Sequence, residues 1–184
     1  MKEAIEITTK VLKSLNEAEI PHMVVGAFAR SYHSFARATQ DADIVVTVGA
    51  AAMDRLASAL GEEFTIDPQA TFETNTGTFR FCIIHRQSAF KTELFVLSSD
   101  PFDQERFRRR RPFIFNGLPS FVLTAEDVII TKLRWARPKD LEDVRDVIAV
   151  QGDRLDSDYL HHWTALHGTR AKLDEIRASI PPLD

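Results

Sequence analysis

The spacing of apolar side chains changes along the chain and predicts where helices and strands alternate. Residues 2–18 repeat apolar side chains at helical spacing with charges between them, which predicts an amphipathic first helix. A short apolar stretch at residues 23–25 predicts a buried strand. Gly26 follows it, and residues 27–35 favour a second helix. The first part of the chain is therefore predicted to run from helix to strand and back to helix.

Further strands and one small helix are predicted in the middle of the chain from runs rich in β-branched and aromatic residues. The predicted strands cover residues 41–48, 64–66, 78–84, 90–97, 113–115 and 121–123, and the predicted helix covers residues 50–60 and ends at Gly61. Asn116-Gly117 indicates a hairpin between the last two strands, with a connecting loop longer than two residues.

Helical spacing returns after residue 124. Thr124-Ala125-Glu126-Asp127 resembles a capping box, so we expect a helix to begin near Ala125. Asp140 and Asp156 are predicted to cap two further helices, and a last helix should follow Thr169. We therefore predict an α/β core over residues 1–124 and a helical region over residues 125–184 that packs on the core.

Composition restricts the class of protein. The 184 residues carry a net charge of −4 with 44% hydrophobic residues, which suits a globular chain without a general bias toward nucleic acid. The single cysteine, Cys82, excludes an internal disulfide and a cysteine-rich metal site. No stretch has the length or apolar character of a signal peptide or a membrane span, so we expect a cytoplasmic protein without a membrane partner.

The strongest candidate for chemistry is the acidic pair at the start of the strand predicted over residues 41–48. Alternate strand residues share a face, so Asp41 and Asp43 should project together, roughly 6 to 7 Å apart at Cα. Oxygen ligands of this kind suit Mg²⁺, and Glu93 on another strand is the natural third carboxylate. The plainer interpretation is a solvated acidic pair, with Glu93 as an exposed partner of Lys91 or of an arginine.

Several ordered motifs carry a family resemblance. Val25-Gly26-Ala27 followed by Arg37-Ala38-Thr39-Gln40-Asp41-Ala42-Asp43-Ile44 resembles the signature of the nucleotidyltransferase superfamily that includes DNA polymerase beta. More narrowly, it is similar to a small bacterial group related to abortive-infection nucleotidyltransferase toxins. The similarity continues through residues 91–96, 125–133, 141–144 and 155–163, and covers most of residues 20–166.

The resemblance implies an α+β fold, with a nucleotidyltransferase-like mixed β-sheet, helices packed on one face of the sheet and a C-terminal helical region. It also implies a role for each matching residue. Asp41, Asp43 and Glu93 would be catalytic and hold Mg²⁺, while Gly26, Ala27, Arg37, Thr39 and Lys132 would bind the nucleotide. Two residues depart from the family pattern, because Ala27 replaces a second glycine and Glu93 replaces the more common aspartate.

The implied function is metal-dependent transfer of a nucleoside monophosphate from an NTP to a hydroxyl acceptor on tRNA, protein or a small molecule. The alternative is a catalytically weak or inactive relative that serves as a nucleotide-binding or interaction module. Clustered arginines could bind a tRNA acceptor or simply form a solvated face; they are Arg106, Arg108, Arg109, Arg110 and Arg111. A cognate antitoxin and a second copy of the chain are further candidate partners.

Overall fold

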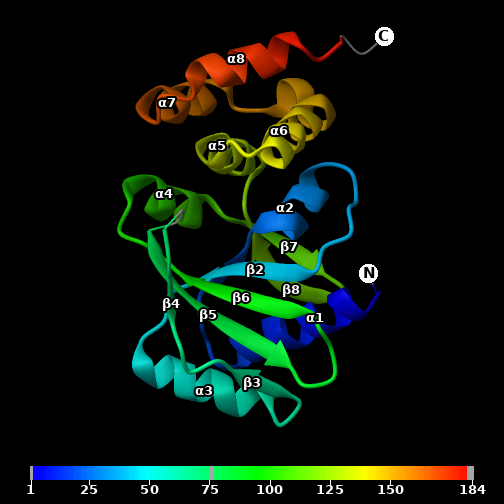
Figure 1. The fold of residues 1–184 in the computed structure, drawn as a ribbon, viewed down its shortest axis with the longest axis vertical. Coiled ribbons are helices and arrows are strands. Elements are labelled where there is room, and N and C mark those ends of the chain that lie inside the picture. The colour runs from blue at the N-terminus through cyan, green and yellow to red at the C-terminus, as the bar shows by residue number, and fades with distance from the viewer. Residues whose placement is uncertain (1, 75–76, 182–184) are drawn as a thin grey trace. The chain divides into compact units, whose positions relative to one another are not determined.

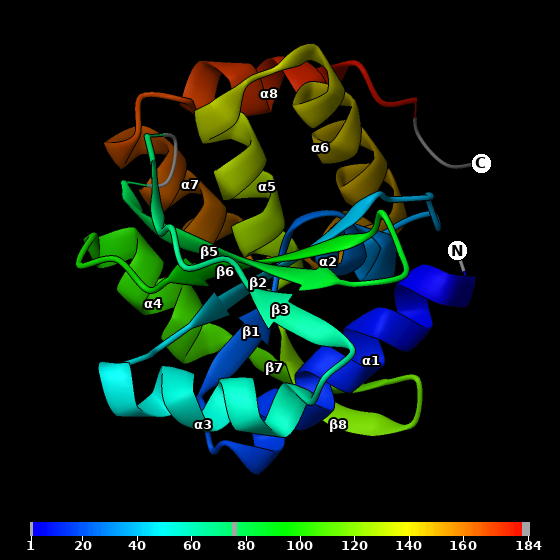
Figure 2. The ribbon, with the colours of Figure 1, turned by 60° about the horizontal axis from the view of Figure 1, so that its bottom comes forward.

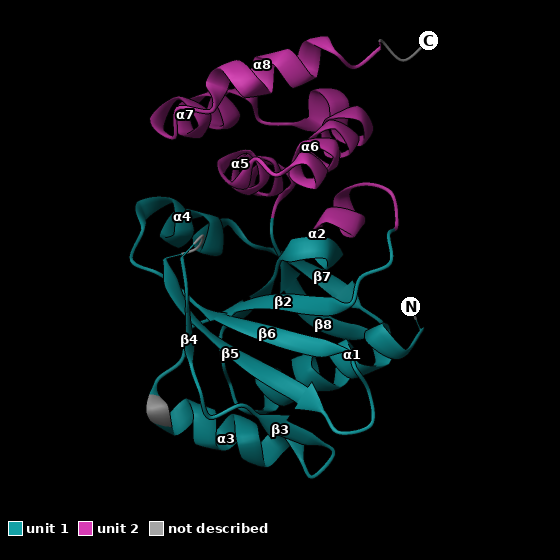
Figure 3. Cartoon of the chain, viewed as in Figure 1, with its two compact units in different colours: residues 1–28, 37–123 teal, residues 29–36, 124–184 magenta. Residues whose placement is uncertain are grey.

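The computed structural model describes residues 2–74 and 77–181. The chain divides into two compact units, of which unit 1 comprises residues 1–28 and 37–123, and unit 2 comprises residues 29–36 and 124–184 (Figure 3). Within the described residues, no helix is long and apolar enough to cross a membrane.

Unit 1 is built on a mixed sheet whose strand order is β3-β5-β6-β2-β1-β8-β7, with β4 added beside β5 (Figure 1). The β2–β6 and β1–β8 pairs are parallel, and the other pairs are antiparallel. The strands are β1 (His22–Val24), β2 (Asp41–Val46), β3 (Phe64–Ile66), β4 (Thr71–Glu73), β5 (Thr78–His85), β6 (Lys91–Val96), β7 (Arg111–Phe115) and β8 (Leu118–Val122).

Helices α1 (Lys2–Glu17) and α3 (Ala50–Leu60) pack on one face of this sheet (Figure 2). Their apolar stripes bury Leu12, Leu15 and Leu56 completely against the strands. The alternate residues Ile44 and Val46 of β2 face the same core. The mixed sheet with helices on one face confirms the predicted α+β nucleotidyltransferase-like fold.

One local prediction for unit 1 is wrong, and two elements of this unit were not predicted. The β7–β8 hairpin pairs Phe115 with Leu118, so its loop is only the two residues Asn116 and Gly117. Both have positive φ, the geometry of the tight turn that matches the twist of a hairpin. The sequence interpretation also missed β4 and helix α4 (Pro101–Arg109), whose first turn is capped by the Asp100 side chain.

Unit 2 contains α5 (Ala125–Trp135), α6 (Pro138–Gln151), the short 3₁₀ helix η1 (Gly152–Arg154), α7 (Ser157–Leu166) and α8 (Arg170–Ala178), as the predicted helical region requires. It also takes in the later residues of α2 (Gly26–His33). The Thr124 and Asp156 side chains cap α5 and α7 as predicted. The Asp140 cap is wrong, because α6 begins at Pro138 and Asp140 lies inside the helix.

Candidate active site

The register of two parallel strands sets the geometry of the candidate site. Strand β2 pairs with β6 so that Asp43 lies beside Glu93 and Asp41 beside Lys91. Residues paired in register project to the same face of a sheet, and neighbouring strands are about 4.8 Å apart. Asp41, Asp43 and Glu93 therefore share the face opposite to the buried side chains of Ala42 and Ile44.

Gly26 follows β1 and opens helix α2, where its backbone lies against the Asp43 carboxylate. A Cβ atom built at Gly26 would be 1.9 Å from Asp43 Oδ2, and its φ of +59° also favours glycine. The Val25 amide donates to the Asp43 carbonyl at 2.9 Å, which ties the end of β1 to β2. Ala27 lies within the first turn of α2 and is half-buried. The strand-to-helix turn is therefore shaped around one acidic side chain.

Thr39 orients the other carboxylate of the pair. Its hydroxyl contacts the Asp41 carboxylate oxygen Oδ1 at 2.9 Å and the Asp41 carbonyl at 3.0 Å. Thr39 is half-buried, whereas Asp41 is exposed at the start of β2. Arg37 is also exposed, in the loop before this strand. Thr39 and Asp41 thus form a local hydrogen-bonded unit in the loop leading to the sheet.

Glu93 is held by an arginine that the sequence interpretation did not single out. Arg80 Nη1 lies 3.0 Å from both Glu93 Oε1 and Oε2. The same nitrogen is 3.8 Å from Glu73 Oε2, so the guanidinium lies between carboxylates of β4 and β6. In residues 2–74 and 77–181, no three acidic, histidine or cysteine side chains come together as a ready-made metal site. Glu93 shares the face of Asp41 and Asp43 but is engaged by Arg80.

By themselves, the two aspartates supply the kind of oxygen ligands that Mg²⁺ prefers. Mg²⁺ is commonly held by one or two carboxylates, with water and substrate phosphates completing its octahedron. Asp41 and Asp43 supply two carboxylates on one face, and the glycine at position 26 leaves the Asp43 carboxylate room that a side chain would fill. The two aspartates therefore fit a magnesium site whose remaining ligands do not come from this pair.

Lys132 lies in unit 2, within a network of ion pairs with aspartates of α6. Its Nζ is 2.8 Å from Asp140 Oδ1 and 2.9 Å from Asp143 Oδ2, and its side chain is only 9% exposed. Arg137 also pairs with Asp140, at 2.6 Å. Burial alone would raise the pKa of the Asp140 carboxyl, but hydrogen bonds from Arg137 and Lys132 hold it below its ordinary value. Lys132 thus has a structural role in unit 2, and its contact with phosphates stays a prediction.

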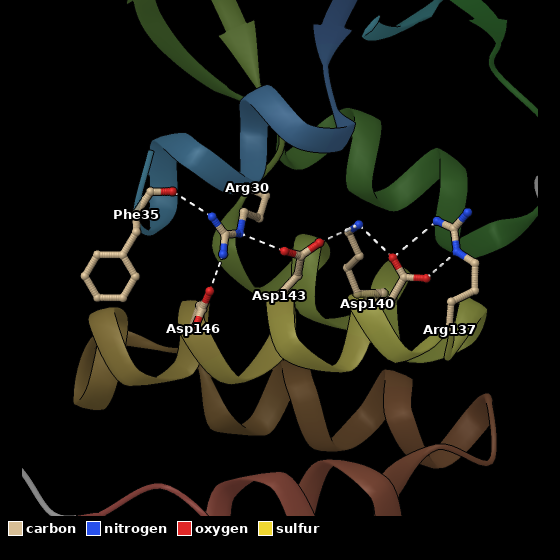
Figure 4. Close-up of polar contacts among 7 residues, drawn as sticks. Arg30, Phe35, Arg137, Asp140, Asp143 and Asp146 are labelled. Atoms are coloured by element: carbon tan, nitrogen blue, oxygen red, sulfur yellow. Dashed lines mark hydrogen bonds and ion pairs between the residues drawn. The ribbon is translucent and has the colours of Figure 1, made fainter. Parts of the chain in front are cut away.

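Arg30 extends this network to helix α2. Its guanidinium pairs with Asp143 at 2.9 Å, forms a second ion pair with Asp146, and donates to the Phe35 carbonyl at 2.6 Å (Figure 4). The Arg30 side chain is 5% exposed. Three aspartates spaced three residues apart on α6 thus face three cations, which balances the buried charge.

The arginines proposed for tRNA contact take different positions in and after α4. Arg106 is buried and pairs with Asp103 at 2.9 Å, while Arg108 pairs with Glu105 at 2.7 Å. The Arg110 guanidinium lies over the Phe107 and Phe121 rings, 4.2 and 4.9 Å from their centroids. Arg109 is half-buried, and Arg111 is exposed at the start of β7. Part of this basic run therefore stabilises unit 1.

Comparisons with known proteins show the fold. No family model matches the sequence, and no significant match is found among curated proteins. The chain is similar to the solution structure of the antibiotic-resistance factor ANT(2'')-Ia, with 14% identity, a TM-score of 0.61 and coverage of 97% of this chain and 98% of the other.

Two further solved structures have a similar fold. One is ANT(2'')-Ia in complex with adenylyl-2''-tobramycin, with 14% identity, a TM-score of 0.58 and coverage of 91% of this chain and 98% of the other. The second is an antigenic nucleotidyltransferase-like protein from Paracoccidioides brasiliensis, with 19% identity, a TM-score of 0.52 and coverage of 96% and 94%. The abortive-infection subgroup stays a prediction. Together with the strand register, these likenesses establish that the chain has the nucleotidyltransferase fold.

Proposed function

We propose that this chain transfers a nucleoside monophosphate from an NTP to a hydroxyl acceptor and releases pyrophosphate. The observation that carries the proposal is the placement of Asp41 and Asp43 on one sheet face, with the Asp43 carboxylate against the Gly26 turn. The nucleotidyltransferase fold and the glycine turn beside two carboxylates support this reaction. The tobramycin adenylyl complex of a structural neighbour makes a small hydroxylated molecule a reasonable acceptor to test.

In this proposal, different residues of unit 1 bind the metal ion and the triphosphate. Asp41 and Asp43 would hold the divalent cation, and Thr39 keeps the Asp41 carboxylate in one orientation through its hydroxyl contact. The first turn of α2, at Gly26 and Ala27, offers backbone N–H groups that have no partner within the helix, and a triphosphate can accept from them. A bound Mg²⁺ would supply charge neutralisation and polarise the phosphate oxygens.

Glu93 would complete the reaction as the base. The acceptor oxygen forms a bond to the α-phosphorus, and the bond from that phosphorus to the bridging oxygen of pyrophosphate breaks. The hydroxyl proton passes to the Glu93 carboxylate, which must first be free of Arg80. Arg37 and Lys132 stay candidates for contact with the nucleotide.

A second candidate function is a nucleotide-binding or interaction module with weak or absent catalysis. The contact of Arg80 with both oxygens of Glu93 favours this second function, because the oxygens that would accept the hydroxyl proton are already engaged by a donor. The added methylene of Glu93 relative to aspartate points the same way, since small displacements of a catalytic group reduce rate strongly.

Two successive measurements separate these functions. Saturating MgATP or MgGTP should raise the midpoint of thermal unfolding of the wild-type chain, and Asp43→Asn should lose most of this increase. Pyrophosphate release is then measured with tobramycin, tRNA and a protein acceptor. Release with one acceptor supports the transferase, and nucleotide binding without release supports the module. An unchanged unfolding midpoint with both nucleotides would refute nucleotide binding in both candidate functions.

A further inference from the structure

Arg80 engages Glu93, the third carboxylate on the sheet face that carries the proposed magnesium site. One nitrogen, Arg80 Nη1, is 3.0 Å from each of the two Glu93 oxygens. A cation at equal distances from both oxygens lies on the bisector of the carboxylate. That is also where a metal ion chelated by both oxygens would lie, so the guanidinium and a chelated metal cannot occupy it together.

The neighbouring strand gives Arg80 a second anion. Glu73 Oε2 is 3.8 Å from the same Nη1, and β4 and β6 flank the strand that carries Arg80. The Arg80, Glu93 and Glu73 side chains are 28%, 21% and 23% exposed, so water and ions can reach them. An ion pair that water reaches costs less to open than a fully buried one. Arg80 can therefore leave Glu93 and stay beside a carboxylate, that of Glu73.

The charges on this face of the sheet set Arg80 and a divalent cation in competition for the Glu93 carboxylate. Asp41, Asp43 and Glu93 contribute three negative charges along adjacent strands. Lys91 adds a positive charge beside Asp41, and Arg80 opposes the charge of Glu93. A divalent cation at the aspartate pair would be repelled by the guanidinium and would lose the third carboxylate to it.

We propose that Arg80 is a positioning residue that withholds Glu93 from the metal site, so that the metal-free protein carries a two-carboxylate site and gains its third ligand only when Arg80 moves away. This inference rests on the proposed function, because it assumes that Asp41 and Asp43 bind a divalent cation. It explains why the three carboxylates share a face without forming a cluster in the described residues.

The test measures binding of Mn²⁺ alone, by the electron paramagnetic resonance signal of the free ion, with no nucleotide present. Arg80→Met should bind Mn²⁺ more tightly than wild type, on the order of tenfold, because a positive charge is removed and Glu93 becomes available. Arg86→Met, which removes an exposed arginine that follows β5, is the matched control and should bind like wild type. Arg80→Gln replaces Arg80→Met if circular dichroism shows that the latter is unfolded.

The decisive comparison repeats the substitution in a Glu93→Gln background. The gain from Arg80→Met should disappear there, because it operates through the Glu93 carboxylate. An equal gain with and without Glu93 would show a general charge effect and overturn the inference while leaving the metal site standing. Unchanged Mn²⁺ affinity in Arg80→Met would overturn it as well. If wild type and every variant fail to bind Mn²⁺, the proposed metal site fails together with the inference.

Discussion

Replacement of Gly26 by alanine tests the turn on which the proposed site is built. A Cβ at this position would lie 1.9 Å from Asp43 Oδ2 and 2.8 Å from the carboxyl carbon, so the Asp43 side chain must move. The φ of +59° adds backbone strain of about 1 to 2 kcal/mol for a residue other than glycine. Displacement of a packed side chain adds about 1 to 3 kcal/mol. We therefore expect Gly26→Ala to lower the free energy of unfolding by about 2 to 5 kcal/mol.

Gly117→Ala is the matched control. Gly117 lies in the same unit with a φ of +83°, and nothing lies within 4 Å of the position that a Cβ would take there. It should therefore show the backbone strain alone. Urea unfolding gives both free energies, and thermal unfolding with saturating MgATP shows whether the nucleotide still stabilises each variant. Equal destabilisation of the two variants, with the nucleotide effect kept in both, would refute the claim that Gly26 is required by the Asp43 carboxylate.

Three further outcomes follow from the charged groups. Asp43→Asn should lose most of the stabilisation by MgATP. Its free energy of unfolding should change little, since the substitution relieves repulsion between neighbouring carboxylates. A large loss would instead identify Asp43 as a structural carboxylate. Lys132→Met should lower the free energy of unfolding by about 3 kcal/mol, because it breaks buried ion pairs. Lys139→Met, at an exposed position, should change this free energy little. Equal losses in the two variants would contradict the structural role of the ion-pair network. The pKa of Asp140 is lowered in the folded chain, so its contribution to stability is complete above its ordinary value of 3.8 and falls away below it. The free energy of unfolding, measured with urea, should fall less between about pH 5 and pH 2 in Asp140→Asn than in the wild type. An equal fall in both proteins would argue against the lowered pKa of Asp140.

Local patterns in the sequence were enough to predict much of the fold. Alternation in β2 placed Asp41 and Asp43 on one face and Ile44 on the other, because strand periodicity depends only on neighbouring residues. Thr124 and Asp156 were predicted as helix caps for the same reason, since a cap bonds to an amide three residues later. Gly26 was also identified from the sequence as the residue between the first strand and the second helix, and its backbone lies against the Asp43 carboxylate.

Contacts across elements could not be predicted in this way. The pairing of Arg80 with Glu93 depends on the register between β5 and β6, which the sequence of either strand does not determine. Arg30 and Asp143 lie on helices far apart in the chain, and their ion pair had no local signal. Asp140 was wrongly predicted as a cap, because an acidic residue near the start of a helix can either cap the helix or form ion pairs. Here it forms ion pairs with Lys132 and Arg137.

The most direct test of the proposed function is a crystal structure of the wild-type chain with a non-hydrolysable NTP analogue and Mn²⁺, located by its anomalous scattering. The proposal predicts an anomalous peak within about 2.3 Å of carboxylate oxygens from both Asp41 and Asp43, with the triphosphate at the Gly26 turn. A nucleotide bound elsewhere, or a metal ion that contacts neither aspartate, would contradict it.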